Sequence, residues 1–137
     1  MADPIRHARG LVDTSVVVDM ERIPAYRLPR EVAVSAITMA ELTAGPHAAT
    51  NAEERARRQD RLQRAEAAFD PLPFDGESAR AYGRVYAAVV AWGRKARGAR
   101  AVDLLIAATA VAVRIPLYTR NAEDFEMIGN LVEVVEV

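Results

Sequence analysis

Four acidic residues lie far apart in this 137-residue chain but share one kind of neighbourhood. Each follows a short apolar run or opens a segment with a helical pattern; they are Asp13, Glu41, Asp103 and Asp124. Carboxylates about 4 Å apart repel by about 4 kcal/mol per pair at an effective dielectric near 20, so a cluster of them needs a cation. Oxygen ligands, with no cysteine or well-placed histidine beside them, suit Mg²⁺ or Mn²⁺. Without metal, at least one of four crowded carboxyls should have a raised pKa.

A divalent ion held by these acids could hydrolyse a phosphodiester bond, because it activates a bound water and stabilises the developing charge on the phosphate. Each acid also has a structural explanation. Thr38 and Glu41 have capping-box spacing, and Asn121 as a cap would place Asp124 in an equivalent position. Asp103 would complement the dipole of its helix. Two interpretations therefore stay open: a metal-dependent hydrolase, or a catalytically silent domain that binds a partner and whose acids are helix caps.

Five apolar segments predict the strands that must position these acids, at residues 10–12, 32–37, 69–74, 115–118 and 131–137. Prolines within 69–74 make that strand weak and place it at an edge. Strands that alternate with helical segments predict a three-layer α/β/α domain with a central parallel sheet of four to five strands. Ligands of such sheets collect beyond the carboxyl ends of the strands, where these acids would meet. Residues 1–9 are expected to form a tail and residues 10–137 one domain.

The helical segments between these strands have recognisable ends. Asp13, Thr14 and Ser15 are cap-type residues that open the first helix. Thr38 is expected to cap the next helix, and Gly45-Pro46 to end it. A long polar helix is predicted over 51–67, another over about 75–93, and a mostly buried one carries Asp103. Core packing is the favoured role for one face of the 75–93 helix, formed by Tyr82, Val85, Val89 and Trp92.

Composition limits the class of protein. The chain is 51% hydrophobic and 27% charged, which is typical of a globular domain, and it has no cysteine for a disulfide or a thiolate site. No membrane span or signal peptide is recognised, so we expect a cytoplasmic protein. The net charge is −1, but basic residues gather just before Asp103, at Arg94, Lys95, Arg97 and Arg100. This group is interpreted either as a solvated loop or as a contact for RNA phosphates.

Four motifs in this order resemble the PIN-domain family, and in particular the VapC-type ribonuclease toxins of bacterial toxin–antitoxin pairs. The motifs are Leu-Val-Asp13-Thr-Ser15, Ser35-Ala-Ile-Thr-Met-Ala-Glu41-Leu, Asp103-Leu-Leu-Ile-Ala-Ala and Thr119-Arg-Asn121-Ala-Glu-Asp124-Phe. The resemblance covers residues 10–137 and implies a PIN-like nuclease domain: an Mg²⁺-dependent endoribonuclease. It also implies a VapB-type antitoxin whose C-terminal segment blocks the site, a homodimer or toxin–antitoxin hetero-oligomer, and contact with DNA only through the antitoxin.

The resemblance also assigns roles to residues. Asp13 and Asp103 match the central metal ligands, and Glu41 matches the acid that completes the pocket and orients the attacking water. Asp124 matches the fourth acid, while Thr14 and Asn121 match polar residues that support the site. Several relatives carry an acid where this chain has Asn121, which leaves open whether Asn121 or Asp124 faces the metal and whether a second ion binds.

Overall fold

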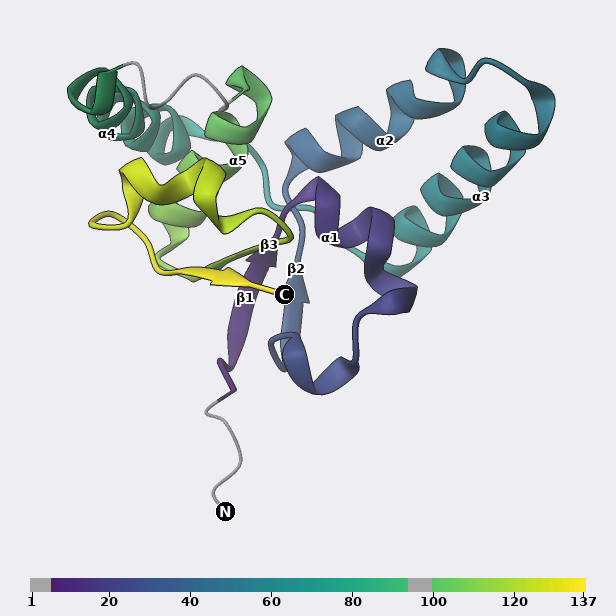
Figure 1. Ribbon diagram of the computed structural model, residues 1–137, viewed down its shortest axis with the longest axis horizontal. Helices are drawn as coiled ribbons and strands as arrows, with labels where there is room; N and C mark the ends of the chain where they lie inside the picture. Colours follow the sequence, from purple (N-terminus) through teal and green to yellow (C-terminus); the bar gives the residue numbers. More distant parts are fainter. Residues whose placement is uncertain (1–5, 94–99) are drawn as a thin grey trace.

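The computed structural model describes residues 6–93 and 100–137 (Figure 1). Its centre is a four-stranded sheet in the order β2-β1-β3-β4, in which all neighbours are parallel. The strands are β1 (Arg9–Val12), β2 (Glu31–Ala33), β3 (Leu117–Thr119) and β4 (Val134–Glu136). Leu11 of β1 is in register with Ala33 on one side and Leu117 on the other. The predicted parallel α/β sheet of four to five strands is therefore confirmed, with four strands.

Five α-helices connect the strands: α1 (Thr14–Asp19), α2 (Ala36–Ala48), α3 (Ala52–Ala68), α4 (Gly76–Trp92) and α5 (Ala101–Val113). The described residues also include the 3₁₀ helices η1 (Met20–Arg22), η2 (Ala25–Arg27) and η4 (Ala122–Ile128). Four α-helices begin at side-chain caps, which are Asp13, Ser35, Asn51 and Asp75. Each cap accepts a hydrogen bond from the amide three residues on, so the chain leaves each preceding strand or loop in a fixed direction. No helix among the described residues is long and apolar enough to span a membrane.

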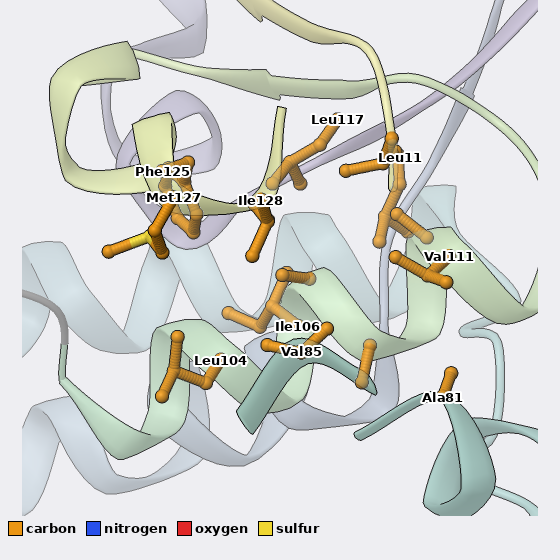
Figure 2. Packing of buried hydrophobic residues seen from close by; sticks show 14 of the residues in the cluster. Leu11, Ala81, Val85, Leu104, Ile106, Val111, Leu117, Phe125, Met127 and Ile128 are labelled. Atoms are coloured by element: carbon orange, nitrogen blue, oxygen red, sulfur yellow. The ribbon is translucent and has the colours of Figure 1, made fainter. Parts of the chain in front are cut away.

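Alternate strand residues point to opposite faces of the sheet and bury two separate cores. Leu11 and Leu117 face α4, α5 and η4, in a core that includes Ile106, Phe125 and Ile128 (Figure 2). On the other face, Val12 of β1, Tyr118 of β3 and Val34, which directly follows β2, pack with side chains of α1, α2 and α3. The helix residues in this core are Val16, Val17, Leu42, Leu62 and Ala65. The two cores make the three layers expected of the domain.

Helices α2 and α3 form an antiparallel hairpin that projects beyond the sheet (Figure 1). The sequence pattern predicted a stop at Gly45-Pro46, and this is wrong, because α2 continues through Pro46 to Ala48. The carbonyls of Gly45 and Pro46 accept hydrogen bonds from Arg58 and Arg55 of α3, which satisfies the backbone at this end of the helix. Contacts with α3 therefore extend α2 past its local stop signal.

Strand lengths also differ from those predicted. The segment 69–74 is not a strand: Leu72 makes only an isolated parallel bridge to Ser35. The strand expected over 32–37 ends at Ala33, because β1 provides partners for only three residues of β2. Of the expected tail, the carbonyls of His7 and Ala8 accept hydrogen bonds from Arg30 and Glu31, while residues 1–5 lie outside the described part of the chain.

Candidate active site

Asp13 follows the last residue of β1 and caps α1. Its Oδ1 atom accepts hydrogen bonds from the Ser15 hydroxyl at 2.6 Å and the Val16 amide at 3.2 Å. The residue is only 4% exposed, and this burial raises the pKa of the Asp13 carboxyl because the charged form loses hydration. Hydrogen bonds from Ser15, Thr119 and Val16 lower that pKa, and nearby Asp103 raises it slightly further. A raised pKa was expected among these acids, although its main cause is burial rather than crowding.

Glu41 lies in the second turn of α2 and contacts the start of α1. The Thr14 hydroxyl donates a hydrogen bond to Glu41 Oε1 at 2.5 Å. The capping box predicted from Thr38 and Glu41 is wrong, because Ser35 is the cap and accepts a hydrogen bond from the Thr38 amide at 3.0 Å. Glu41 therefore lies too far into the helix to serve as a capping residue. The structural explanation that the sequence offered for Glu41 no longer applies, and its contact with Thr14 requires another.

Asp103 lies in the first turn of α5, beside Arg100. Arg100 Nε lies 3.2 Å from Asp103 Oδ2, and Arg100 Nη2 lies 3.5 Å from Glu41 Oε2. The pKa of the Arg100 guanidinium is raised, first by the hydrogen bond and charge of Asp103 and then by the charges of Glu41 and Asp13. One guanidinium therefore contacts carboxylates of α2 and α5, and the charge of Asp13 after β1 also acts on it.

Three of the four predicted acids thus meet beyond the carboxyl end of the sheet. Asp13 and Asp103 are close enough for one charge to affect the other, and Arg100 lies between Glu41 and Asp103. With the side chains in this arrangement, residues 6–93 and 100–137 contain no group of three or more acidic or histidine residues that could hold a metal ion. The acids are therefore gathered around a guanidinium rather than around an open cavity.

Asp124 and Asn121 lie in and beside η4, the helix that follows β3. Asn121 is at the cap position, but its side chain makes no capping hydrogen bond, so the predicted box with Asp124 is wrong. Asp124 is half-buried, and its amide donates to the Asn121 carbonyl at 3.1 Å. The link between this loop and the site runs through its neighbour Arg120, whose amide donates to the Ser15 hydroxyl at 3.1 Å.

Comparison with known proteins identifies the family of this chain. The sequence profile of the PIN domain matches residues 10–131. The chain belongs to the PIN-domain family. One relative of this PIN domain is Ribonuclease VapC5 of Mycobacterium tuberculosis, which is 33% identical over 95% of this chain and 96% of the relative. Another is Ribonuclease VapC of Rickettsia bellii, which is 32% identical over 93% of this chain and 95% of the relative. The resemblance to the VapC group is therefore confirmed.

Solved structures show the same fold. The VapBC-5 toxin–antitoxin complex of Mycobacterium tuberculosis has a chain that matches with a TM-score of 0.80 and 32% identity, covering 95% of this PIN domain and 99% of that chain. VapBC2 of Rickettsia felis, solved with a DNA fragment from its promoter, matches with a TM-score of 0.75 and 21% identity, over 94% and 98%. At that lower identity the likeness concerns the fold alone.

The PIN domain also uses polar residues that were not recognised as part of the site. Ser15 was identified only as a cap-type residue, yet it bonds both Asp13 and the Arg120 amide. Thr119 ends β3 and contributes a side-chain hydrogen bond that lowers the pKa of Asp13. Its position at a strand end, like that of Asp13, was the one signal in the sequence that could have identified it.

The predicted RNA contacts divide between two parts of the chain. Arg94, Lys95 and Arg97 lie outside the described residues. Arg100 is described, and its guanidinium contacts Asp103 and Glu41. Its side chain is 66% exposed, so it neutralises the acids from their solvent side.

Proposed function

We propose that this chain is a divalent-metal-dependent endoribonuclease and the toxin of a toxin–antitoxin pair. Two relatives that carry the name Ribonuclease VapC support the proposal, since each is more than 30% identical over nearly the whole chain. The observation that carries it is the convergence of Asp13, Glu41 and Asp103 on one cation, the Arg100 guanidinium. A capping role explains neither the position of Glu41 nor this convergence.

The donor set fits Mg²⁺ or Mn²⁺. Asp13 and Asp103 supply only carboxylate oxygens, which such hard ions prefer. Burial disfavours the charged form of Asp13, so a nearby divalent charge would offset the loss of hydration. The ion pair between Arg100 and Asp103 supports this proposal, because a positive charge already lies beside that carboxylate. Asp13 and Asp103 would hold the ion, and the ion would supply an activated water together with stabilisation of the phosphate charge.

The other residues of the site would orient the reactants. Glu41 Oε1 is fixed by Thr14, which leaves Oε2 to align the attacking water once Arg100 moves away. Arg100 would then pair with a phosphate of the RNA instead of with carboxylates. We propose Arg94, Lys95 and Arg97 as further phosphate contacts, because they are basic and come shortly before Arg100 and Asp103 in the sequence.

Asp124 would act as the fourth acid, directly or through a water. Asn121 would support the site as a polar neighbour, and the choice between these two residues as the one that faces the metal stays open. Both residues lie directly after β3, in the segment where the Arg120 amide donates a hydrogen bond to Ser15. Because Ser15 also bonds Asp13, movement of this loop would reach the proposed metal ligands.

The partner would be a cognate VapB-type antitoxin. One structure similar to this chain at 32% identity is a VapBC toxin–antitoxin complex. We infer a cytoplasmic protein that forms either a homodimer or a hetero-oligomer with the antitoxin. DNA contact would come through the antitoxin, since the described part of this chain offers no separate DNA-binding fold.

The alternative is a silent binding domain, and one observation favours it: Asp13 does cap α1. The two proposals are separated by incubating single-stranded RNA with the purified chain and Mg²⁺, with and without EDTA. Asp13→Asn retains a capping side chain, so it and Asp103→Asn should keep the circular dichroism spectrum but lose cleavage. RNA that the wild type leaves intact in Mg²⁺ favours the silent domain. Cleavage that both variants retain, or that survives EDTA, contradicts the metal-dependent mechanism at these aspartates.

A further inference from the structure

A row of hydroxyl groups leads from the buried side of α2 to Glu41. Thr38 is completely buried, and its hydroxyl oxygen lies 3.1 Å from that of Thr14 and 3.4 Å from that of Ser35. Thr14 in turn contacts Glu41 Oε1 at 2.5 Å. The row crosses from α2 to α1 and back to α2, so it joins two helices beside the acids.

The direction of these hydrogen bonds follows from counting hydrogens. A carboxylate can only accept, so the single hydroxyl hydrogen of Thr14 is used by Glu41 in the short, charge-assisted bond. Thr14 therefore has no hydrogen left for Thr38, and Thr38 must be the donor between the two hydroxyls. Ser35 accepts from the Thr38 amide with its oxygen and donates its own hydrogen toward the Thr38 hydroxyl. Every donor along the row then points toward Glu41, an arrangement in which successive hydrogen bonds strengthen one another.

Thr38 does not make the hydrogen bond that a helical threonine usually makes. Thr43 and Thr109 donate to the carbonyls of Met39 and Leu105, four residues earlier in their own helices. Thr38 lies in the first turn of α2, so the carbonyl four residues earlier belongs to Val34, outside the helix, where it accepts the Leu72 amide at 2.9 Å. The side chain is directed instead to Thr14, so its hydroxyl serves a contact between helices.

We propose that Thr38 is a positioning residue, which fixes the direction of the Glu41 carboxylate by orienting the Thr14 hydroxyl. The inference rests on the proposed nuclease function and extends the site to a residue that touches neither RNA nor metal. Without the Thr38 hydroxyl, the Thr14 oxygen loses the donor that fixes its side chain, so its hydrogen bond to Glu41 would weaken and Glu41 could rotate toward Arg100. Polar partners of this kind typically change metal affinity or activity by about ten- to a hundredfold when lost.

Thr38→Val tests the proposal, because valine keeps the shape of the side chain and removes the hydroxyl. Thr109→Val is the matched control. Thr109 is equally buried in α5, and within residues 6–93 and 100–137 its hydroxyl bonds only the Leu105 carbonyl. We expect Thr38→Val to lower kcat for RNA cleavage about tenfold with little change in KM, and to weaken Mn²⁺ affinity about threefold. Thr38→Ser retains a hydroxyl and should bring kcat to within about threefold of wild type and return the Mn²⁺ affinity to the wild-type value.

Urea unfolding of each variant reports the stability lost, and Mn²⁺ affinity is measured by calorimetry without RNA. Equal kcat and equal Mn²⁺ affinity in Thr38→Val and Thr109→Val overturn the proposal, as does a failure of Thr38→Ser to restore them. A wild type that binds Mn²⁺ but leaves RNA intact contradicts the nuclease function instead. In that case the difference in Mn²⁺ affinity between Thr38→Val and Thr109→Val still decides whether Thr38 positions the carboxylates.

Discussion

Arg100 and Asp103 form an ion pair in which Nε lies 3.2 Å from Oδ2, and the same guanidinium reaches Glu41 at 3.5 Å. Only a side chain placed between two helices can make both contacts, since Glu41 belongs to α2 and Asp103 to α5. These two contacts therefore show that the start of α5 lies within reach of Glu41 on α2. In the proposed reaction a divalent ion would replace the guanidinium as the neutralising charge.

Arg100→Ala should strengthen the binding of divalent ions. In this variant the carboxylates of Glu41 and Asp103 lose a competing cation, so the free energy of Mn²⁺ binding becomes more favourable. Arg100 is 66% exposed and its charge is screened by solvent, so we expect an increase in Mn²⁺ affinity of only about threefold. Calorimetric titration measures the Mn²⁺ affinity. Arg84→Ala is the control, because Arg84 is an exposed arginine on α4. Weaker binding by Arg100→Ala would show that Arg100 organises the acids rather than competes for them.

The pKa of Asp13 makes stability depend on pH. A carboxyl whose pKa is raised on folding holds its proton more tightly in the folded state than in the unfolded state. Its contribution to stability is therefore fully present below the unfolded value of 3.8 and is lost as pH rises through the higher folded value. We predict that metal-free Asp13→Asn is more stable than wild type at pH 7, with a smaller difference near pH 3.

Urea midpoints at several pH values measure that difference. Mg²⁺ should stabilise the wild type but not Asp13→Asn, and its binding should release protons, which calorimetry in buffers of different ionisation enthalpy detects. A wild type more stable than Asp13→Asn at pH 7 without metal would mean that hydrogen bonds to Asp13 outweigh its burial.

Ser15→Ala removes a hydroxyl that connects two parts of the site. Ser15 donates to Asp13 at 2.6 Å and accepts from the Arg120 amide at 3.1 Å, so its loss leaves the Arg120 amide without that partner. We expect a loss of about 1 kcal/mol in the free energy of unfolding and weaker Mn²⁺ binding. Ser78→Ala is the matched control, because Ser78 also bonds the aspartate that caps its helix, Asp75. Similar Mn²⁺ affinities in the two variants would exclude a role for Ser15 in the site.

Gly10 lies where β1 passes the ring of Tyr118. A Cβ at this position would come within 2.5 Å of the Tyr118 ring and 3.0 Å of the Pro29 ring. Gly10→Ala should therefore destabilise the fold by about 1–3 kcal/mol, as overpacking of a core does. Gly83→Ala is the contrasting change, since no atom lies within 4 Å of its Cβ, and helix propensity should make it stabilising by about 0.5–1 kcal/mol. Thermal unfolding compares the two, and a Gly10→Ala variant as stable as wild type contradicts the packing argument.

The sequence predicted the elements whose signals are local. Asp13 after an apolar run, Asn51 before a polar helix and Asp75 before an amphipathic one all proved to be caps. Burial of α5 followed from its nearly unbroken apolar composition. The end of β1 and the start of α5 were both predicted from such signals, and these are the positions of Asp13 and Asp103.

Features that depend on distant partners could not be predicted in this way. Both Ser35 and Thr38 are suitable caps, and the choice of Ser35 follows from where β2 stops pairing with β1. The length of α2 depends on Arg58, which bonds the Gly45 carbonyl from the next helix. The contact of Ser15 with the Arg120 amide joins residues 105 positions apart, and no local pattern encodes it.

The most direct test of the central claim is the anomalous difference map of a crystal of this chain grown with Mn²⁺. The account predicts a manganese peak bonded to carboxylate oxygens of both Asp13 and Asp103, with the Arg100 side chain turned away from Asp103. A peak that avoids either aspartate, or a map with no peak near them at saturating Mn²⁺, would contradict it.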